Sequence, residues 1–275
     1  MVKLVLDSSA DGRAPEGVLF QSVPLTISTD EHSFRDDGAL DIGDMLSHLG
    51  RHSGRSYTAC PSVDDWIQAF AGAAVVFAVT ITSSLSGCYN AAMAAQRLYA
   101  QTHPEVFVHV FDSLSTGPEM ALLAEKLAEL AGKGLSPEEI VREAEAYLQS
   151  TRLFFVLQSL HNLAVNGRVS KLVAAAVGVL GIRILATASN EGTIAPISKC
   201  RGDRKAIPEL LEQLEHAGYH GGKLRVSHVQ NQALAETLAQ KVHEKWPEAD
   251  IQIYPAGGLC SYYAEIGGIL VGMES

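Results

Sequence analysis

In the first half of the chain, short runs of branched apolar residues alternate with stretches in which apolar residues recur every three or four positions. Short apolar runs are typical of buried strands, and the longer period is typical of helices packed on them. Strands are predicted at Val2–Leu6, Val18–Ile27 with a break at Pro24, Ala74–Thr80 and Val106–Phe111. Helices are predicted at Asp41–Leu49, from the Ser62 cap through Phe70, at Gly87–Gln101, at Pro118–Ala131 and from the Ser136 cap onward. Such alternation implies a mainly parallel sheet covered by helices.

From about Thr151 the order of the predicted elements changes. Two runs, Ile182–Thr187 and Gly192–Ser198, have too few residues between them for a helix, so they are predicted to be neighbouring antiparallel strands. Further strands are predicted at Leu153–Leu157, Lys223–Val229, Ile251–Tyr254 and Gly268–Met273, and helices at Ser159–Val165, Leu172–Leu180, Arg204–His216 and Ala233–Lys245. We therefore expect two α/β domains. Residues 1–150 form one with a mainly parallel, Rossmann-like sheet, and residues 151–275 form one with a mixed sheet.

The composition is that of an acidic globular protein. Hydrophobic residues make up 47% and charged residues 19% of the 275 positions, and the formal net charge is −10. This balance argues against a surface that binds nucleic acid or an anionic membrane, because such a surface needs clustered Lys and Arg. The apolar start of the chain is too short for a signal peptide, and the longest apolar run, Leu172–Leu180, is about half of a membrane span. These features predict a cytoplasmic protein.

The cysteines and histidines form no motif of a disulfide framework or a metal site. Cys60, Cys88, Cys200 and Cys260 lie far apart with no C-x-x-C pair, and ten histidines are scattered without an H-E-x-x-H motif. We therefore expect reduced cysteines in the core, and neither a metal ion nor a cofactor.

Three polar segments follow predicted strands or precede predicted helices, where α/β proteins commonly bind anions. Thr82–Tyr89 offers several hydroxyls and the free N–H groups of the next helix, although a serine-rich helix cap has the same pattern. Tyr57–Ser62 places Thr58 ahead of a capped helix and also fits an ordinary turn. Asn166–Ser170 carries Arg168, which suits an anion or a partner's carboxylate as well as open solvent.

The motifs of common enzymes are missing from the sequence. A nucleophile elbow at Ser86 needs glycine two residues before and two after it, and these positions are Ser84 and Cys88. The sequence has no P-loop motif, and no G-x-G-x-x-G motif follows the first predicted strand. We therefore expect a binding protein and no enzyme. A serine hydrolase using Ser86, and a carrier of another small anionic or apolar ligand, remain as alternatives.

Taken together, these segments resemble the DegV family of bacterial fatty-acid-binding proteins. Thr82–Tyr89 is similar to that family's Ser-Ser-x-Leu-Ser-Gly-Thr-Tyr signature, and Thr58–Ser62 to its Thr-Ser-Gln-Pro-Ser loop. Asn166–Ser170 is similar to its Gly-Gly-Arg-Ile-Ser turn. The other matching segments are Asp7–Asp11, Val23–Leu25 with Asp36–Gly38, Asp112–Ser113 and Lys199–Gly202.

The resemblance implies a carrier that encloses one long-chain fatty acid and takes part in bacterial phospholipid metabolism. It implies that Thr58 and the Ser86–Gly87 loop hold the carboxylate, with Ser83 close by. It further implies that Arg168 lies at a portal where a fatty acid kinase is met. That kinase supplies the ATP chemistry and forms the acyl phosphate, so the carrier itself needs no cofactor.

The end of the chain departs from the family pattern. The family's His-x-Gly-Pro-Gly segment is replaced by Ser261–Gly268, where Tyr262 or Tyr263 is the candidate for the hydrogen bond of the missing histidine. The predicted walls of the lipid tunnel are Ala91–Ala95, Val173–Leu180, Phe154 and Phe155.

Overall fold

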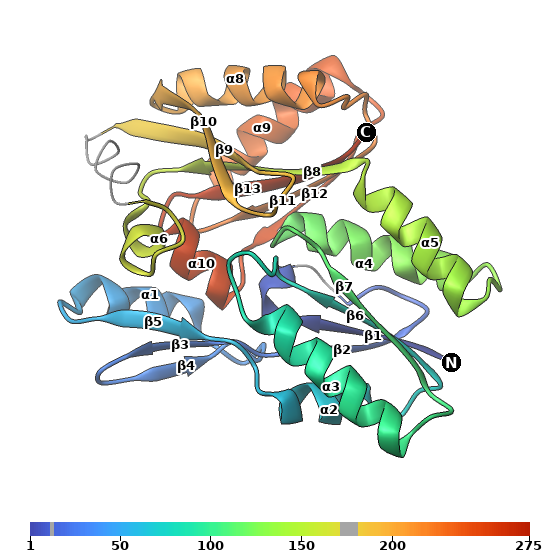
Figure 1. The fold of residues 1–275 in the computed structure, drawn as a ribbon. Helices are drawn as coiled ribbons and strands as arrows, with labels where there is room; N and C mark the ends of the chain where they lie inside the picture. Colours follow the sequence, from blue (N-terminus) through green and yellow to red (C-terminus); the bar gives the residue numbers. More distant parts are fainter. Residues whose placement is uncertain (12–13, 171–180) are drawn as a thin grey trace.

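The computed structural model describes residues 1–11, 14–170 and 181–275, which form three sheets and the helices packed on them. Figure 1 shows the two larger sheets one above the other, with helix α4 (Pro118–Ala131) between them and the third, small sheet to one side. The predicted helix at Leu172–Leu180 lies outside the described residues. Within the described residues, no helix is long and apolar enough to cross a membrane.

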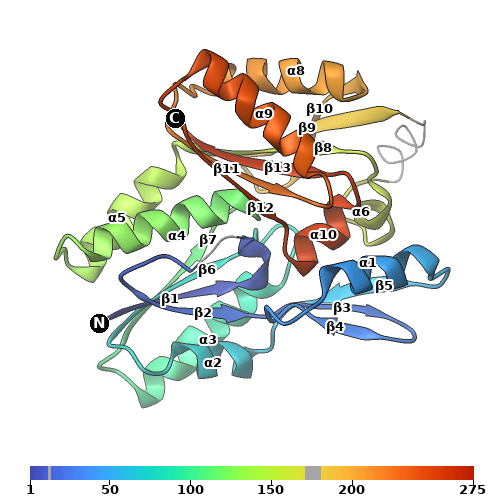
Figure 2. The same ribbon diagram turned by 180° about the vertical axis from the view of Figure 1, so that it is seen from behind.

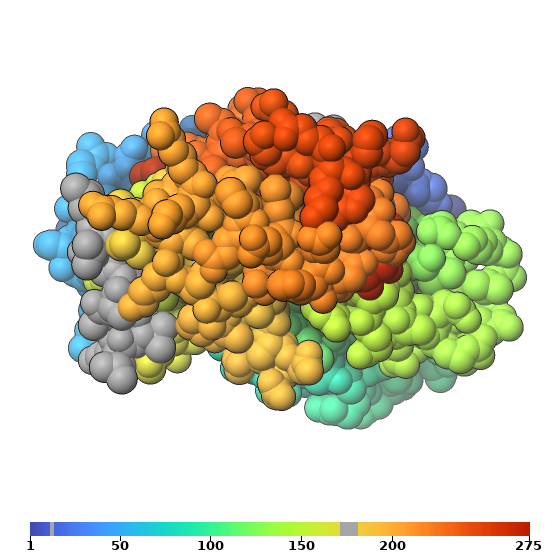
Figure 3. Space-filling model, turned by 90° about the horizontal axis from the view of Figure 1, so that it is seen from above, coloured from blue at the N-terminus to red at the C-terminus, as the bar shows by residue number. Residues whose placement is uncertain are grey.

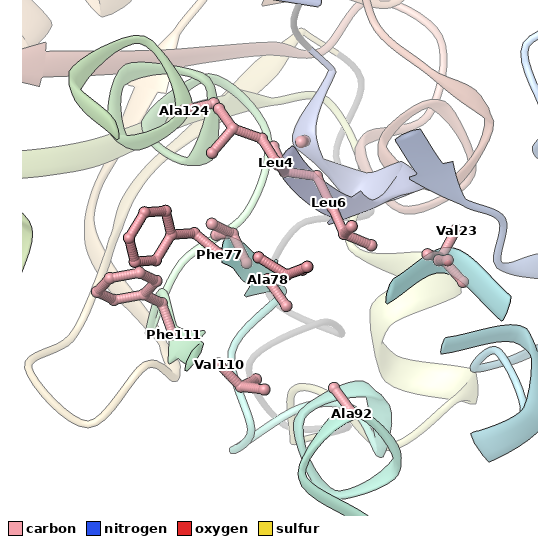
Figure 4. Packing of buried hydrophobic residues seen from close by; sticks show 14 of the residues in the cluster. Leu4, Leu6, Val23, Phe77, Ala78, Ala92, Val110, Phe111 and Ala124 are labelled. Carbon is pink, nitrogen blue, oxygen red and sulfur yellow. The ribbon is translucent and has the colours of Figure 1, made fainter. Parts of the chain in front are cut away.

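The first sheet is parallel throughout, in the order β2-β1-β6-β7. Its strands are β1 (Val2–Asp7), β2 (Leu19–Val23), β6 (Val75–Thr80) and β7 (Phe107–Asp112). Helices α2 (Val63–Phe70) and α3 (Cys88–Thr102) cover one face and α4 the other, with α5 (Pro137–Leu148) packed beside α4. Figure 4 shows the buried side chains between these layers, with Leu4 beside Ala124 of α4 and Phe77 beside Phe111. The prediction of a mainly parallel first sheet is confirmed.

The largest sheet is mixed, in the order β10-β9-β8-β13-β11-β12, with only β11 and β12 parallel among its described pairs. Its strands are β8 (Thr151–Leu157), β9 (Ile182–Ala188), β10 (Ile194–Arg201), β11 (Lys223–His228), β12 (Asp250–Pro255) and β13 (Ile269–Glu274). Helices α8 (Asp203–His216) and α9 (Gln232–Lys245) cover its outer face, and Figure 3 views the molecule from that side. The predicted mixed sheet, including the antiparallel pair β9 and β10, is confirmed.

The third sheet was not predicted. It joins β3 (Thr26–Thr29), β4 (Ser33–Arg35) and β5 (Ser56–Ala59) in the order β4-β3-β5, with helix α1 (Ile42–Arg51) beside it. The predicted strand Val18–Ile27 is in fact β2 and β3 in different sheets, because Pro24 has no N–H to continue a ladder. The segment Tyr57–Ser62, for which an ordinary turn was one interpretation, begins within β5, which pairs with β3.

Helix α4 is buried on both faces because it lies between the two larger sheets. Every residue from Pro118 to Ala124 is buried, including the carboxyl group of Glu119. Glu119 accepts hydrogen bonds from Ser115 and from Thr151 at the start of β8, and burial raises its pKa. These contacts join the first sheet to the largest one.

An ion pair makes a second connection between α4 and the largest sheet. Arg225 of β11 is 1% exposed, and its guanidinium binds both carboxylate oxygens of Glu125, at 2.6 and 2.8 Å. The same group donates to Asp250 Oδ2 at 2.8 Å. A buried guanidinium is stable only when its donors are satisfied, so α4 is held firmly against this sheet.

Candidate functional site

An apolar hollow lies where the carboxyl ends of β2, β6 and β7 face the inner side of the largest sheet. Its empty volume is about 770 Å³, counted out to its open mouth. The side chains that line it from the first half of the chain are Leu25, Thr58, Ile81, Thr82, Leu85, Ser86, Leu114, Ser115 and Thr116. Those from the second half include Leu153, Phe155, Leu157, Leu163, Arg168, Ile194, Leu259, Tyr263 and Leu270. This mostly apolar lining, with a few polar side chains, suits an apolar ligand that carries a polar group.

The wall from β8 follows the alternation of a strand. Leu153, Phe155 and Leu157 face the hollow, whereas Phe154 and Val156 point to the opposite face and pack in the core under α8 and α9. Phe155 is therefore a wall residue as predicted, and Phe154 is not. The predicted wall at Ala91–Ala95 is also wrong, because Ala92 and Ala95 pack in the core of the first sheet. The predicted wall at Val173–Leu180 lies outside the described residues.

Polar groups gather at one part of this wall. The hydroxyls of Thr58, on β5, and of Tyr263 lie 2.8 Å apart and share a hydrogen bond. The guanidinium carbon of Arg168 lies 5.9 Å from the centre of the Tyr263 ring, and Arg168 Nε donates to Leu85 O at 3.3 Å. Ser86 follows Leu85 directly and also lines the hollow. The fold therefore brings four predicted residues together in one part of the wall, which we call the polar end: Thr58, Ser86, Arg168 and Tyr263.

Two further predicted residues lie beside the hollow without lining it. Ser83 is fixed by its backbone N–H, which donates to Asp112 Oδ1 at 3.0 Å. Gly87 directly precedes α3, and a Cβ at this position would lie 3.2 Å from the sulfur of Cys60. Glycine thus lets the loop at the start of α3 approach the segment after Thr58. Thr82 lines the hollow instead of Ser83, and its hydroxyl donates to Gly192 O at 2.9 Å.

The two candidate tyrosines lie in different surroundings. Both belong to helix α10 (Gly258–Ala264), which was not predicted. Tyr262 is fully buried, and its hydroxyl lies 2.7 Å from Ser56 Oγ and accepts from Asn166 Nδ2 at 2.8 Å. Tyr263 lines the hollow, and burial raises the pKa of its hydroxyl, which therefore remains a protonated donor. Of the two, Tyr263 is the one placed to contact a ligand.

Two aspartates hold the N-terminus of α10. The Asp36 carboxylate accepts hydrogen bonds from the N–H groups of Gly258 and Leu259, at 2.9 and 3.0 Å. Asp11 Oδ1 accepts from Gly257 N at 2.8 Å. Burial raises the pKa of both carboxyl groups, that of Asp11 to about 7. Carboxylates satisfy the free N–H groups at a helix start. Asp11 and Asp36, which belong to two of the family-like motifs, therefore position the helix that carries Tyr263.

A third aspartate positions the loop that ends in Ser86. Asp7 Oδ2 accepts from Ile81 N at 2.7 Å, and Asp7 Oδ1 accepts from Ser9 Oγ at 2.5 Å. Burial is the main cause that raises the pKa of Asp7 to about 6. Its oxygens are thus occupied by the protein itself, and Asp7 is not among the residues that line the hollow.

The surroundings of Ser86 do not resemble those of a nucleophile. Its hydroxyl donates to Cys88 Sγ at 3.2 Å and accepts from Cys88 N at 3.3 Å, so it is bonded to the first residue of α3. Among the described residues that line the hollow, none is a histidine or a carboxylate. A serine nucleophile needs an adjacent base, so this arrangement suits ligand binding better than hydrolysis.

The comparisons with known proteins cover nearly the whole chain. A family model described as "Uncharacterised protein, DegV family" matches residues 1–274. The chain belongs to the DegV family. A DegV domain-containing protein of Streptococcus pneumoniae is 44% identical over 276 residues, which cover 99% of this chain and 98% of that protein. The resemblance inferred from the motifs is thereby confirmed.

Two similar solved structures hold fatty acids. A DegV family protein from Eubacterium eligens, loaded with heptadecanoic acid, is 51% identical with a TM-score of 0.98, and the match covers 100% of both chains. The Fatty Acid Kinase B3 protein of Streptococcus pneumoniae, loaded with linoleic acid, is 42% identical with a TM-score of 0.97. That match covers 100% of this chain and 99% of the other.

Proposed function

We propose that this DegV protein is a carrier that encloses one long-chain fatty acid and catalyses no reaction itself. The observation that supports this most strongly is the apolar hollow, one part of whose wall carries the hydroxyls of Thr58 and Tyr263 close to the guanidinium of Arg168. Each buried methylene stabilises a complex by roughly 0.8 kcal/mol. A chain of about sixteen carbons therefore gains on the order of 10 kcal/mol, from which the costs of association are subtracted.

The carboxylate needs polar partners because a bare charge is costly to bury. In the proposed complex, the hydroxyls of Thr58 and Tyr263 turn from each other to the carboxylate, and the Ser86 hydroxyl adds a third donor. Arg168 supplies the nearby positive charge. Ser83 and Gly87 support the loop without touching the ligand. The fatty acids bound in the two relatives indicate a chain of similar length here.

We further propose that a separate fatty acid kinase acts on the bound acid to form an acyl phosphate. One similar structure is a Fatty Acid Kinase B3 protein, and this chain matches it along its whole length. The segments beside the polar end are open to a partner, since Ala59, Cys60 and Gly87 are exposed. Arg168, half-buried beside them, is the residue we expect nearest to the kinase.

Native mass spectrometry of delipidated protein tests the carrier function. We expect one palmitate or oleate per chain, and a Thr58→Val, Ser86→Ala double variant that keeps its circular dichroism spectrum but binds at least tenfold more weakly. That factor corresponds to about 1.4 kcal/mol, which is typical of lost hydrogen bonds to a charged group. A wild-type protein that takes up neither acid would refute the proposal, and equal affinities of variant and wild type would place the carboxylate elsewhere.

A further inference from the structure

Three histidines that lie apart in the sequence gather at the outer end of the small third sheet. His32 lies in the turn between β3 and β4, and His48 and His52 lie at the C-terminal end of α1. The ring centres of His32 and His48 are 4.4 Å apart, and those of His48 and His52 are 5.8 Å apart. Their scattered positions in the sequence predicted no metal site, because the grouping arises only when the turn folds against α1.

The arrangement offers nitrogen and oxygen donors to a metal ion. One donor atom each of Glu31, His32 and His48 lies within 4.8 Å of the other two. Donors around tetrahedral Zn²⁺ lie about 3.4 Å apart, given metal–nitrogen distances of about 2.0 Å. Glu31 and His32 are exposed and can close this gap by side-chain rotation. Their backbone is already fixed, because Thr29 Oγ1 accepts from the N–H groups of Glu31 and His32 at 3.2 and 3.0 Å.

A buried imidazole, that of His52, lies beside these donors. The side chain of His52 is only 7% exposed, and its Nε2 makes no hydrogen bond within the part of the chain that the structure describes. Asp30 Oδ1 lies 2.8 Å from this nitrogen, and Glu31 Oε2 lies 3.9 Å from His52 Nδ1. The nearest polar neighbours of this buried imidazole are therefore the carboxylates of Asp30 and Glu31. His52 lines the same polar hollow as His32 and His48.

We propose that Glu31, His32 and His48 bind a divalent transition metal ion, with His52 as the adjacent fourth donor. Imidazole-rich sets select zinc and its neighbours in the transition series over magnesium or calcium, which prefer oxygen ligands. His48 lies in the last turn of α1 and His52 directly follows the helix, and their rings are stacked 5.8 Å apart. The Asp30 and Glu31 carboxylates add the negative charge that attracts a cation.

A bound ion would join the β3–β4 turn to the end of α1. Helix α1 packs against α10, which carries Tyr263, and β3 pairs with β5, which carries Thr58. The metal therefore stabilises the layer that supports the polar end of the hollow. The site does not depend on the proposed carrier function, because none of its donors lines that hollow.

Calorimetric titration of ZnCl₂ into chelator-treated, full-length protein without a histidine tag tests the site. We expect one ion per chain, a melting temperature that rises by several degrees with Zn²⁺, and a tetrahedral visible absorption band when Co²⁺ is used instead. The His32→Ala, His48→Ala double variant should lose at least thirtyfold in Zn²⁺ affinity and show no thermal shift. His216→Ala, which removes an exposed histidine on α8, should retain both properties.

Glu31→Gln provides a variant whose folding is not in doubt, because the side chain is exposed in a turn. It should weaken Zn²⁺ binding about tenfold and leave the circular dichroism spectrum unchanged. If the wild type and the double variant bound Zn²⁺ with the same affinity and stoichiometry, the proposed site would be refuted. An unchanged Co²⁺ spectrum in the double variant would do the same. Fatty-acid uptake is measured separately, so failure of one proposal leaves the other standing.

Discussion

At the scale of single residues, the two neighbouring tyrosines of α10 place their hydroxyls in different surroundings. That of Tyr263 lies at the hollow, and that of Tyr262 lies in the protein core. Tyr263 shares a hydrogen bond with Thr58 at the hollow, whereas Tyr262 bonds to Ser56 and Asn166 behind it. The sequence predicted that one of the pair replaces a missing histidine but did not decide between them. Which tyrosine faces the hollow depends on how α10 is oriented about its axis, and the sequence pattern did not predict this helix.

Removal of the hydroxyl should therefore mainly lower ligand affinity at Tyr263 and mainly lower stability at Tyr262. Tyr263→Phe should weaken fatty-acid binding about tenfold, because one hydroxyl to the charged carboxylate is lost, at a cost of about 1.5 kcal/mol. Tyr262→Phe should leave affinity within about twofold but lower the melting temperature, because Asn166 Nδ2 loses its buried acceptor. Fluorescent fatty-acid displacement and thermal melts measure the two effects. Equal losses of affinity in both variants would contradict the assignment.

At the scale of helices and strands, the elements that the sequence predicted well carry their own end signals. Ser62 and Ser136 form capping boxes with Asp65 and Glu139, and Pro118 occupies the first turn of α4. The third sheet lacked such signals because its strands are three or four residues long and β5 pairs with β3 from about thirty positions away. Helix α10 lacked them because its N-terminus is held by Asp36 and Asp11, more than two hundred residues earlier.

The same physical reason limits prediction of the site. The motifs indicated Thr58, Ser86 and Arg168 one by one, since each lies in a local loop pattern. The contact between Thr58 and Tyr263 spans 205 positions and follows from tertiary packing alone. The missed lining residues Ser115, Thr116 and Thr193 also lie in loops from different parts of the chain. Their signal in the sequence was only a short polar residue after a strand.

The dependence of α10 on Asp36 gives a prediction for this element. Asp36→Ala leaves the N–H groups of Gly258 and Leu259 without an acceptor, so stability should fall by about 1–2 kcal/mol. Fatty-acid affinity should fall too, because Tyr263 is no longer held in place. Asp37→Ala removes the same charge from an exposed neighbour and should change neither property appreciably. Urea unfolding and binding titrations separate the outcomes, and identical behaviour of the two variants would exclude a positioning role for Asp36.

At the scale of the whole molecule, the two predicted halves share one central layer. The largest sheet begins at Thr151, next to the predicted boundary, yet α4 packs on both larger sheets and its residues Glu119 and Glu125 bind groups of the largest one. The hollow is likewise lined from both halves. Separating the halves would therefore expose an apolar helix face, a buried guanidinium and the ligand site together.

Because α4 packs on both larger sheets, we expect the two halves to unfold together, and a bound ligand to stabilise both of them. Calorimetry of the delipidated protein should show one transition rather than two. A fatty acid at a free concentration of about one hundred times its Kd adds about 2.7 kcal/mol to the stability of the folded state. For a chain of this size each kcal/mol raises the melting temperature by roughly 2–4 °C, so the single transition should move upward by roughly 5–10 °C. Two transitions, of which only one moved with palmitate, would show instead that the halves unfold independently and that α4 does not couple them.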